Sequence, residues 1–496
     1  MKFPHKITEN VDWNSIRTHT GAVAGGRPSP KFLLFLVILA SSIYVLFTIT
    51  FLFSSHPCHD NHPLPTAADR HHEYHSNATD HQEKTELKHI MFGIAASASL
   101  WEKRKEYLKL WWRPEKEMRG YVWLDRAVKT FPNDILPRIL ISGNTSGFRY
   151  TNKKGHRSAI RISRIVSETV RLGVNGVRWF VMGDDDTVFI TDNLVRVLSK
   201  YDHGGFYYIG SSSESHVQNI AFSYLMAYGG GGFAISYPLA VAIEEMQDRC
   251  IKRYPSLYGS DDRMQACMAE LGVPLTKELG FHQCDIYGDL FGILAAHPVT
   301  PLVTLHHLDL IQPIFPNMTR VQSLKHLMLP MKFDSAGLVQ QSICYEVEKK
   351  WTITVSWGFA VQVFRGYLTP KEVEIPPRTF SNWYKNTDYK GYAFNTRPIA
   401  RNPCQKAFIF YLSKAKLDLS TNVTETQYMH HRVTQLECKW KMPDPGSLEK
   451  IVVYKKTDPH LWDRSPRRNC CRVKASKKKS LILEVSVCKE MEISAI

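Results

Sequence analysis

An apolar run that ends in three consecutive aspartates, WFVMGDDDTVF at residues 179–189, constrains this chain more than any other stretch. A short apolar run bounded by a glycine is typical of a buried strand. Three carboxylates at the end of one strand repel one another, so their ionisation requires a cation nearby. We therefore expect a fold in which a strand end carries Asp184, Asp185 and Asp186 to a place where a cation is bound.

Segments with strand and helix patterns alternate through residues 89–182. Such alternation predicts an α/β domain with a mostly parallel sheet, in which ligands bind beyond the carboxyl ends of the strands. The three aspartates follow one of those ends. Strands are expected at His89–Ala96, Tyr121–Leu124, Arg138–Ile141 and Arg178–Met182, and helices at Trp101–Trp112 and Ser158–Leu172.

The chain from Met331 onward has a different pattern, with short segments rich in aromatic and β-branched residues separated by proline and asparagine turns. This pattern predicts a mainly β C-terminal domain over residues 330–496, and specifically a β-sandwich. Exposed tryptophans in it could stack on sugar rings, although burial in a core is their commoner fate. The clearest strand candidates are Lys350–Tyr367, Phe380–Tyr384, Ala407–Tyr411 and Leu481–Val485.

Residues 32–53 are 22 residues without a charged side chain, the length that a helix needs to cross the roughly 30 Å hydrocarbon layer. Basic residues exceed acidic ones before this segment, so we expect residues 1–31 to be a cytosolic tail and the remainder to be lumenal. A cleaved signal peptide is the alternative, but the segment is long and begins late. Polar residues 54–88 can form little core and are expected to be a stem, which leaves 89–325 for the α/β domain.

Cysteines and glycosylation sequences agree with this topology. All ten cysteines and four Asn-X-Ser/Thr sequences follow the apolar segment, on the side where disulfides form and glycans are added. The net charge of +16 is spread along the chain, and a lumenal protein meets little nucleic acid. We interpret the excess positive charge as a solvated surface or as attraction for anionic substrates, and we expect no nucleic-acid partner.

Five sequence blocks follow one another through the middle of the chain. They are WFVMGDDDTVF at 179–189, YGGGGFAISYP at 228–238, YGSDDRMQAC at 258–267, LGFHQC at 279–284 and LHHLD at 305–309. In this order they resemble the plant Fringe-related proteins, a β-1,3-glycosyltransferase-like family of the DUF604 type. The resemblance implies a GT-A type nucleotide-sugar-binding domain in a single-pass type II Golgi membrane protein. It also implies transfer with inversion from a UDP-sugar to a glycan, glycoprotein or other hydroxyl acceptor, which forms a β, specifically β-1,3, linkage.

The resemblance also implies a divalent metal site at the aspartates. A cation that bridges diphosphate and protein carboxylates stabilises the departing diphosphate, and Mn²⁺ or Mg²⁺ takes oxygen ligands readily. By the family pattern Asp186 is the direct ligand, Asp184 faces the nucleotide or a metal-bound water, and Asp185 faces the donor less certainly. The His-Leu-acid sequence assigns the last ligand, an imidazole that favours Mn²⁺, to His307. His306 is the reserve candidate, because neighbouring strand residues face opposite ways.

The glycine run and the later acidic pair supply the remaining site residues. Glycines permit close backbone approach to a sugar or diphosphate, although a merely flexible loop is the alternative. An inverting transferase needs a base for the acceptor hydroxyl, and the family pattern favours Asp262, with Asp261 second. Capping of the following helix is the competing interpretation of either aspartate. The expected donor-lining residues are Gly230, Gly231, Gly232 and Phe233.

Three other functional classes share features with this sequence. Aspartates after an apolar strand also occur in haloacid-dehalogenase-like phosphatases, but those carry the motif on the first strand, and here about 90 residues of α/β pattern precede it. A non-catalytic, lumenal glycan-binding protein would explain the aromatic C-terminal region. Retention of the metal, base and glycine blocks in one chain favours the active transferase instead. A P-loop nucleotidase is excluded because no GxxxxGK[ST] sequence occurs.

Overall fold

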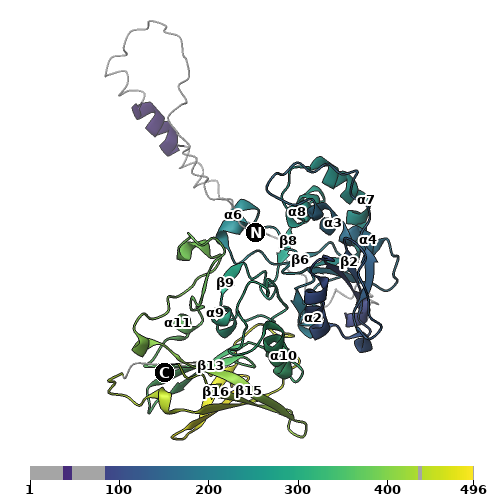
Figure 1. Cartoon of the computed structure of the whole chain (residues 1–496). Helices are drawn as coiled ribbons and strands as arrows, with labels where there is room; N and C mark the ends of the chain where they lie inside the picture. Colours follow the sequence, from purple (N-terminus) through teal and green to yellow (C-terminus); the bar gives the residue numbers. More distant parts are fainter. Residues whose placement is uncertain (1–36, 47–83, 434–437, 495–496) are drawn as a thin grey trace, which may run out of the picture. The chain divides into compact units, whose positions relative to one another are not determined.

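The computed structural model describes residues 37–46, 84–433 and 438–494. Residues 82–496 form one compact unit (Figure 1), and the chain before residue 82 is separate from it. The described part of the expected membrane segment, residues 37–46, is helical. Among the residues that the structure describes, no helix combines the length and apolar composition that a membrane crossing requires. The rest of segment 32–53, the tail 1–31 and most of the stem lie outside the described residues.

The first half of the compact unit contains a mixed seven-stranded sheet with the order β3-β2-β1-β4-β7-β6-β8. Strands β3, β2, β1 and β4 are parallel, as the sequence predicts. The sheet then departs from expectation, because β7 runs antiparallel to both β4 and β6. The strands are β1 Ile90–Ala95, β2 Arg119–Leu124, β3 Arg138–Ile141, β4 Trp179–Asp184, β6 Tyr208–Gly210, β7 Phe233–Ser236 and β8 Leu275–Lys277.

Helices cover both faces of this sheet. Figure 1 shows α3, α4, α7 and α8 together on one side, where their apolar residues form a core with β1, β4 and β7. Helices α2 and α5 pack on the opposite face, in a second core that continues into the C-terminal half. The helices are α2 Trp101–Trp111, α3 Ser158–Ser163, α4 Ile165–Val170, α5 Thr191–Leu198, α7 Tyr237–Arg253 and α8 Asp261–Glu270.

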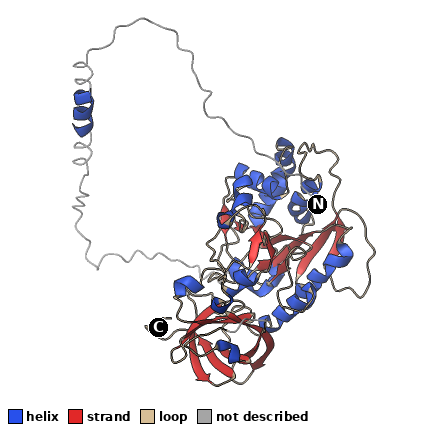
Figure 2. Cartoon of the chain, turned by 60° about the vertical axis from the view of Figure 1, so that its left-hand side comes forward, coloured by secondary structure: helices blue, strands red, loops and turns tan. Residues whose placement is uncertain are grey.

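The C-terminal half contains an eight-stranded sheet with the order β11-β12-β13-β15-β16-β17-β19-β18. A disulfide between Cys344 of β11 and Cys471 of β18 joins its two outermost strands, so the sheet rolls up on itself. Figure 2 shows these strands curving around one another. The predicted β domain is therefore present, but the predicted sandwich is wrong: the chain makes one rolled sheet. The strands are β11 Gln341–Glu346, β12 Trp351–Ser356, β13 Ala360–Arg365, β15 Phe408–Asp418, β16 Val423–His430, β17 Lys450–Lys456, β18 Cys470–Ser476 and β19 Ser480–Ser486.

Two small antiparallel ladders connect distant parts of the chain. Strand β5 (Val188–Phe189) pairs with β10 (Thr304–Leu305), and β9 (Ile286–Gly288) pairs with β14 (Phe380–Asn382). The second ladder joins the two halves of the compact unit, and a hydrophobic core also runs through both. The expected boundary at 325–330 falls within helix α10, so the domain limits stay a prediction. The remaining helices are α6 His216–Ala221, α9 Phe291–Ala295, α10 Arg320–Met331 and α11 Pro370–Val373.

Disulfides stabilise both halves. One joins α7 to α8 through Cys250 and Cys267. Others join Cys404 to Cys438 and Cys470 to Cys488, in addition to the bridge that closes the rolled sheet. Cys284 is a buried free thiol. Cross-links of this number are typical of chains that fold in an oxidising compartment.

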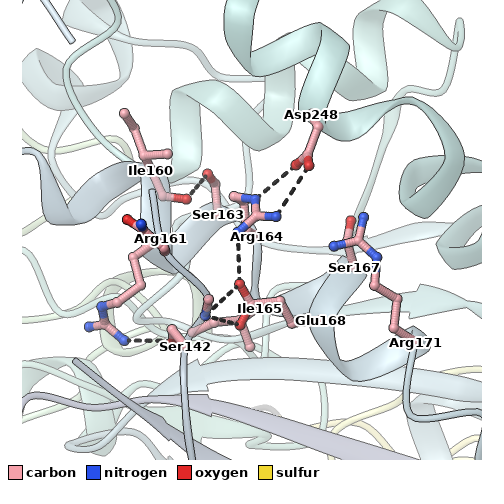
Figure 3. A network of polar contacts seen from close by, with 12 residues as sticks. Ser142, Ile160, Arg161, Ser163, Arg164, Ile165, Ser167, Glu168, Arg171 and Asp248 are labelled. Carbon is pink, nitrogen blue, oxygen red and sulfur yellow. Dashed lines mark hydrogen bonds and ion pairs between the residues drawn. The ribbon is translucent and has the colours of Figure 1, made fainter. Parts of the chain in front are cut away.

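A buried polar network holds the helical layer against the sheet (Figure 3). The expected helix 158–172 is divided into α3 and α4 at Arg164, whose guanidinium lies among carboxylates. Arg164 contacts Asp248 of α7 at 2.8 Å and 3.2 Å and Glu168 at 2.9 Å. Glu168 also accepts hydrogen bonds from the Gly143 amide at 3.1 Å and 3.2 Å. Because Arg164 and Glu168 are both buried, neither can exchange its partner for water.

Replacing Glu168 by alanine is expected to lower the free energy of unfolding by roughly 3 kcal/mol. The change leaves the buried Arg164 guanidinium and the Gly143 amide without the carboxylate that accepts their hydrogen bonds. Glu244→Ala is the matched control, since its contact with Arg171 lies at the surface. That change should cost about 1 kcal/mol or less. Urea unfolding of the two variants measures both values. Equal stability losses would show that the buried network adds nothing beyond a surface pair.

Candidate functional site

Strand β4 delivers the three aspartates to the carboxyl edge of the sheet. Asp184 is its last residue and lies beside Ala95 of the parallel neighbour β1. A tight turn follows, in which the Asp184 amide donates to the Thr187 hydroxyl oxygen at 2.8 Å and the Thr187 amide donates to the Asp184 carbonyl at 3.0 Å. Because the backbone reverses here rather than continuing as a strand, the side chains of Asp185 and Asp186 leave the turn in different directions.

One histidine comes close to two of the aspartates. Oxygen and nitrogen ligand atoms of Asp184, Asp186 and His306 all lie within 4.8 Å of one another. The His306 Nε2 is 3.2 Å from Asp186 Oδ1 and 3.7 Å from Asp184 Oδ2. The β5–β10 ladder causes this approach, since β5 directly follows the aspartates and His306 directly follows β10. Two carboxylates and an imidazole form a donor set that suits Mn²⁺.

The electrostatics of this group indicate that positive charge is lacking. Burial, together with the charges of Asp186 and Asp185, raises the pKa of Asp184 to about 8. Burial also disfavours ionised Asp186, but the His306 imidazole and the Arg104 guanidinium outweigh it and hold the pKa of Asp186 below its usual range. The buried Asp186 oxygens have only ion-pair contacts, with His306 at 3.2 Å and Arg104 at 3.1 Å, and the His306 Nδ1 is buried without a hydrogen-bond partner. These residues therefore fit a divalent cation, which would offset the repulsion between the carboxylates.

His307, the imidazole ligand expected from the sequence, lies elsewhere. Its Nδ1 is 3.1 Å from Asp285 Oδ1, and its ring stacks on Trp383 with centroids 4.9 Å apart and planes 9° apart. His307 has a positive φ of 51°, so the chain turns sharply after β10 and its side chain leaves the metal group. The geometry favours the reserve candidate, His306, as the ligand in place of His307.

Arg104 is a site residue that the sequence did not single out. From α2 its guanidinium reaches Asp185 at 2.8 Å, Asp186 at 3.1 Å and Asp309 at 3.2 Å. Asp185, which also accepts from the Ser97 amide at 3.3 Å, therefore faces α2, away from the expected donor side. Arg104 is one of four basic residues in the sequence WEKRKEYLKLWW, and nothing in that pattern distinguishes it from its neighbours.

The glycine run lies between the metal group and the acidic pair. A Cβ at Gly230 would overlap the His306 ring, and one at Gly229 would lie 2.7 Å from Asp261 Oδ1. Further along, Gly231 donates to Gln283 and accepts from Thr304, while Gly232 has a φ of +82° that favours glycine. The run thus brings Asp261 and His306 toward each other.

The two members of the acidic pair lie in different surroundings. Asp261 and Asp184 line the same small cavity, of about 30 Å³, together with Phe233. Burial raises the pKa of Asp261 to about 6, while a hydrogen bond from the Ser260 hydroxyl opposes the increase. Asp262 instead accepts hydrogen bonds from the amides of residues 258 and 259, at 2.7 Å and 2.9 Å, and so stabilises the turn before α8. Asp261 therefore shares a cavity with Asp184, and Asp262 contacts the backbone; this geometry favours the second candidate, Asp261, over Asp262 as the base.

Comparisons with known proteins identify the family to which this chain belongs. A family model described as "Fringe-like" matches residues 85–287. A second, described as "Protein of unknown function, DUF604", matches residues 218–471, more than half of the 496-residue chain. Human beta-1,3-glucosyltransferase is 30% identical over 105 residues, 21% of this chain and 20% of that protein. The mouse protein of the same name is 30% identical over 109 residues, 22% of this chain and 21% of its own length. The chain thus spans about a fifth of the length of these curated relatives.

Two crystal structures of LgtC were also found, one an active-site mutant and one a galactosyltransferase complex with donor and acceptor sugar analogs. Both are 14% identical to this chain and are covered over 94% of their own length. They cover 47% and 48% of this chain, with TM-scores of 0.32 and 0.30. Scores this low carry no argument about the fold.

Proposed function

This chain belongs to the DUF604 family of Fringe-related, β-1,3-glycosyltransferase-like proteins, and from that membership we propose that it is a metal-dependent, inverting glycosyltransferase with a GT-A type domain. It moves a sugar from a UDP-sugar to a glycan or other hydroxyl acceptor and forms a β, specifically β-1,3, linkage. The observation that carries the proposal is the pairing of a metal-binding group with a carboxylate of raised pKa across one small cavity.

The side chains divide the chemistry between them. Asp184, Asp186 and His306 would hold Mn²⁺ or Mg²⁺. Arg104 keeps Asp185 and Asp186 in place. When bound, the cation offsets the charge that develops on the diphosphate as the sugar leaves. Asp261 accepts the proton of the acceptor hydroxyl while that oxygen bonds to the anomeric carbon. The diphosphate departs with the electron pair of the broken carbon–oxygen bond, which inverts the configuration.

The donor is tested with a panel of UDP-galactose, UDP-glucose, UDP-N-acetylglucosamine and UDP-glucuronate. Release of UDP from at least one of these donors is expected when Mn²⁺ is present. Chelation of the metal should abolish this release, because the aspartates bind the diphosphate through the cation. An Asp186→Asn chain provides the matched blank. If every donor stays intact, or if release persists after chelation, a metal-dependent transferase is excluded and a glycan-binding protein becomes the better hypothesis.

The cellular location proposed for this activity is the Golgi membrane, with residues 32–53 as the anchor and the catalytic part in the lumen. The disulfides support an oxidising compartment. In addition, the described glycosylation acceptors, Asn144, Asn317 and Asn422, are all exposed.

Protease protection tests this topology. In sealed Golgi vesicles, added protease should leave residues 82–496 intact until detergent is added, and glycosidase treatment should reduce the apparent mass, since the acceptor asparagines face the lumen. The cytosolic tail should be cleaved in both conditions. Digestion of the catalytic part in intact vesicles would contradict the proposal.

A further inference from the structure

A second cavity lies where the two halves of the compact unit meet. Its volume is about 380 Å³, within the range of small-molecule sites. The first half contributes residues that follow β6 and β8, and the C-terminal half contributes residues 374–376, residues 393–395 and Arg468. Among the residues that the structure describes, none lines both this cavity and the small cavity of Asp184 and Asp261. A ligand bound here would therefore contact neither of these aspartates.

Apolar side chains provide much of the lining of this second cavity. Phe281 and Ile293 line it from the first half, and Ile375 and Phe394 line it from the C-terminal half. Leu279 also lines it and remains 50% exposed, so apolar surface is left uncovered by the protein. Because burial of apolar surface is favourable, the cavity suits a ligand with an apolar body.

Two carboxylates line the cavity, and each already has a partner. Glu374 Oε2 lies 3.3 Å from the Arg468 Nη2. Glu214 Oε1 lies 3.1 Å from the His282 Nδ1. The first pair is neutral in sum, because the guanidinium keeps its charge at all relevant pH values. The charge of the second pair depends on the protons of the histidines.

A third residue, His297, determines how many protons Glu214 and His282 share. The His297 Nδ1 lies 2.9 Å from the Pro298 carbonyl, which can only accept, so this nitrogen carries a proton. Burial and the neighbouring His282 lower the pKa of His297 to about 3, so at neutral pH its Nε2 accepts from the His282 Nε2 at 3.0 Å. One proton remains between the His282 Nδ1 and Glu214. This pair is therefore also neutral in sum, whichever atom holds the proton.

Lys277 adds one positive charge that no lining carboxylate balances. Its Nζ donates to the Ser212 hydroxyl at 2.8 Å, and within the described part of the chain it forms no ion pair. Burial of part of the side chain lowers the pKa of Lys277, while the charge of Glu214 opposes this decrease. Lys277 nevertheless remains exposed, so an anion can reach it. The cavity thus combines apolar surface with one unbalanced positive charge.

We propose that this cavity binds a small amphipathic monocarboxylate, with an aromatic or branched aliphatic body against Leu279, Phe281 and Phe394 and its carboxylate at Lys277. One negative charge balances the lining, whereas a cationic ligand would add to the excess positive charge. A sugar or nucleotide would place hydroxyl groups against apolar side chains. The site is separate from the proposed transfer reaction and does not depend on it.

Calorimetric titration of the full-length chain tests the class of ligand. The probes are two acids, trans-cinnamate and indole-3-acetate, and two controls. The corresponding alcohols, cinnamyl alcohol and indole-3-ethanol, keep the apolar body without the charge, and acetate keeps the charge without the body. At least one acid should bind, and its alcohol and acetate should each bind at least about tenfold more weakly. Saturating UDP with Mn²⁺ should leave the affinity for the acid unchanged, because the two cavities share no described residue.

Two variants test the assigned contacts. Lys277→Met removes the ammonium and should weaken binding of the acid about tenfold without changing the affinity for the alcohol. Leu279→Ser should weaken binding of both. Lys450→Met is the matched control, because Lys450 is an exposed lysine at the start of β17 and does not line the cavity. The proposal is wrong if neither acid binds, if acid and alcohol bind equally, or if the two lysine variants bind the acid alike. Displacement of the acid by UDP would place it at the transfer site and would also overturn the proposal.

Discussion

Replacing Asp186 by alanine is expected to weaken Mn²⁺-dependent UDP binding by more than about 100-fold while the fold remains intact. Loss of a residue that merely orients a metal ligand already costs about 10–100-fold in metal affinity, and Asp186 is assigned as a ligand itself. His306→Ala should have a similar effect, since its Nε2 lies 3.2 Å from Asp186 and completes the donor set. Calorimetric titration of UDP in the presence of Mn²⁺ gives the affinities, and circular dichroism reports the fold.

His307→Ala is the comparison that makes this test specific. His307 stacks on Trp383 and contacts Asp285, so its loss should disturb the metal group only indirectly, by about tenfold or less. A greater loss with His307→Ala than with His306→Ala would restore the ligand assignment expected from the sequence. Unchanged UDP affinity in Asp186→Ala would instead remove the metal site from this part of the chain.

Replacing Asp261 by asparagine is expected to reduce sugar transfer by about 10²–10⁴-fold, the usual contribution of general-base catalysis. UDP and Mn²⁺ should still bind, because Asp261 is not part of the ligand group. Asp262→Asn is the matched control at the neighbouring position. Its carboxylate accepts backbone hydrogen bonds in the turn before α8, so the variant should keep most of its transfer rate. The reverse result, with transfer lost only in Asp262→Asn, would return the base to the residue that the family pattern favours.

The same assignment fixes the pH dependence of transfer. Asp261 can accept a proton only as a carboxylate, and burial raises its pKa to about 6. Values of kcat/KM should therefore be constant at neutral pH and fall tenfold per pH unit below this pKa. A bound cation favours the ionised form, so the acidic limb is expected at or below pH 6. An acidic limb centred above pH 7 would identify a different base.

The sequence predicted elements better than it predicted side-chain directions. Periodicity located β1, β2, β3, β4 and α2 to within a few residues, because each element buries a regular apolar face. The family pattern selected His307 and Asp262, whereas the geometry favours their neighbours, His306 and Asp261. The positive φ at His307 and the backbone hydrogen bonds of Asp262 determine which member faces the site, and neither is encoded in a pattern of residue types.

Contacts between residues far apart in the chain could not be predicted from the sequence either. Arg104 lies 81 residues before Asp185, and no local pattern indicates that α2 will pack beside the end of β4. The C-terminal sheet presents the same difficulty. Alternating strands have the same sequence pattern in a sandwich and in a rolled sheet, so only the contact between the outermost strands, β11 and β18, which a disulfide joins, distinguishes the two.

The ladder between β5 and β10 has a consequence for dividing this protein into modules. The segment matched by the Fringe-like family model ends at residue 287, whereas β10 and His306 follow it. A fragment cut at that limit would keep both aspartates of the metal group, lose the imidazole, and leave β5 without its partner strand. Fragments designed for engineering should therefore extend beyond β10 and His306, because the segment that the family model matches lacks one of the three residues of the metal group.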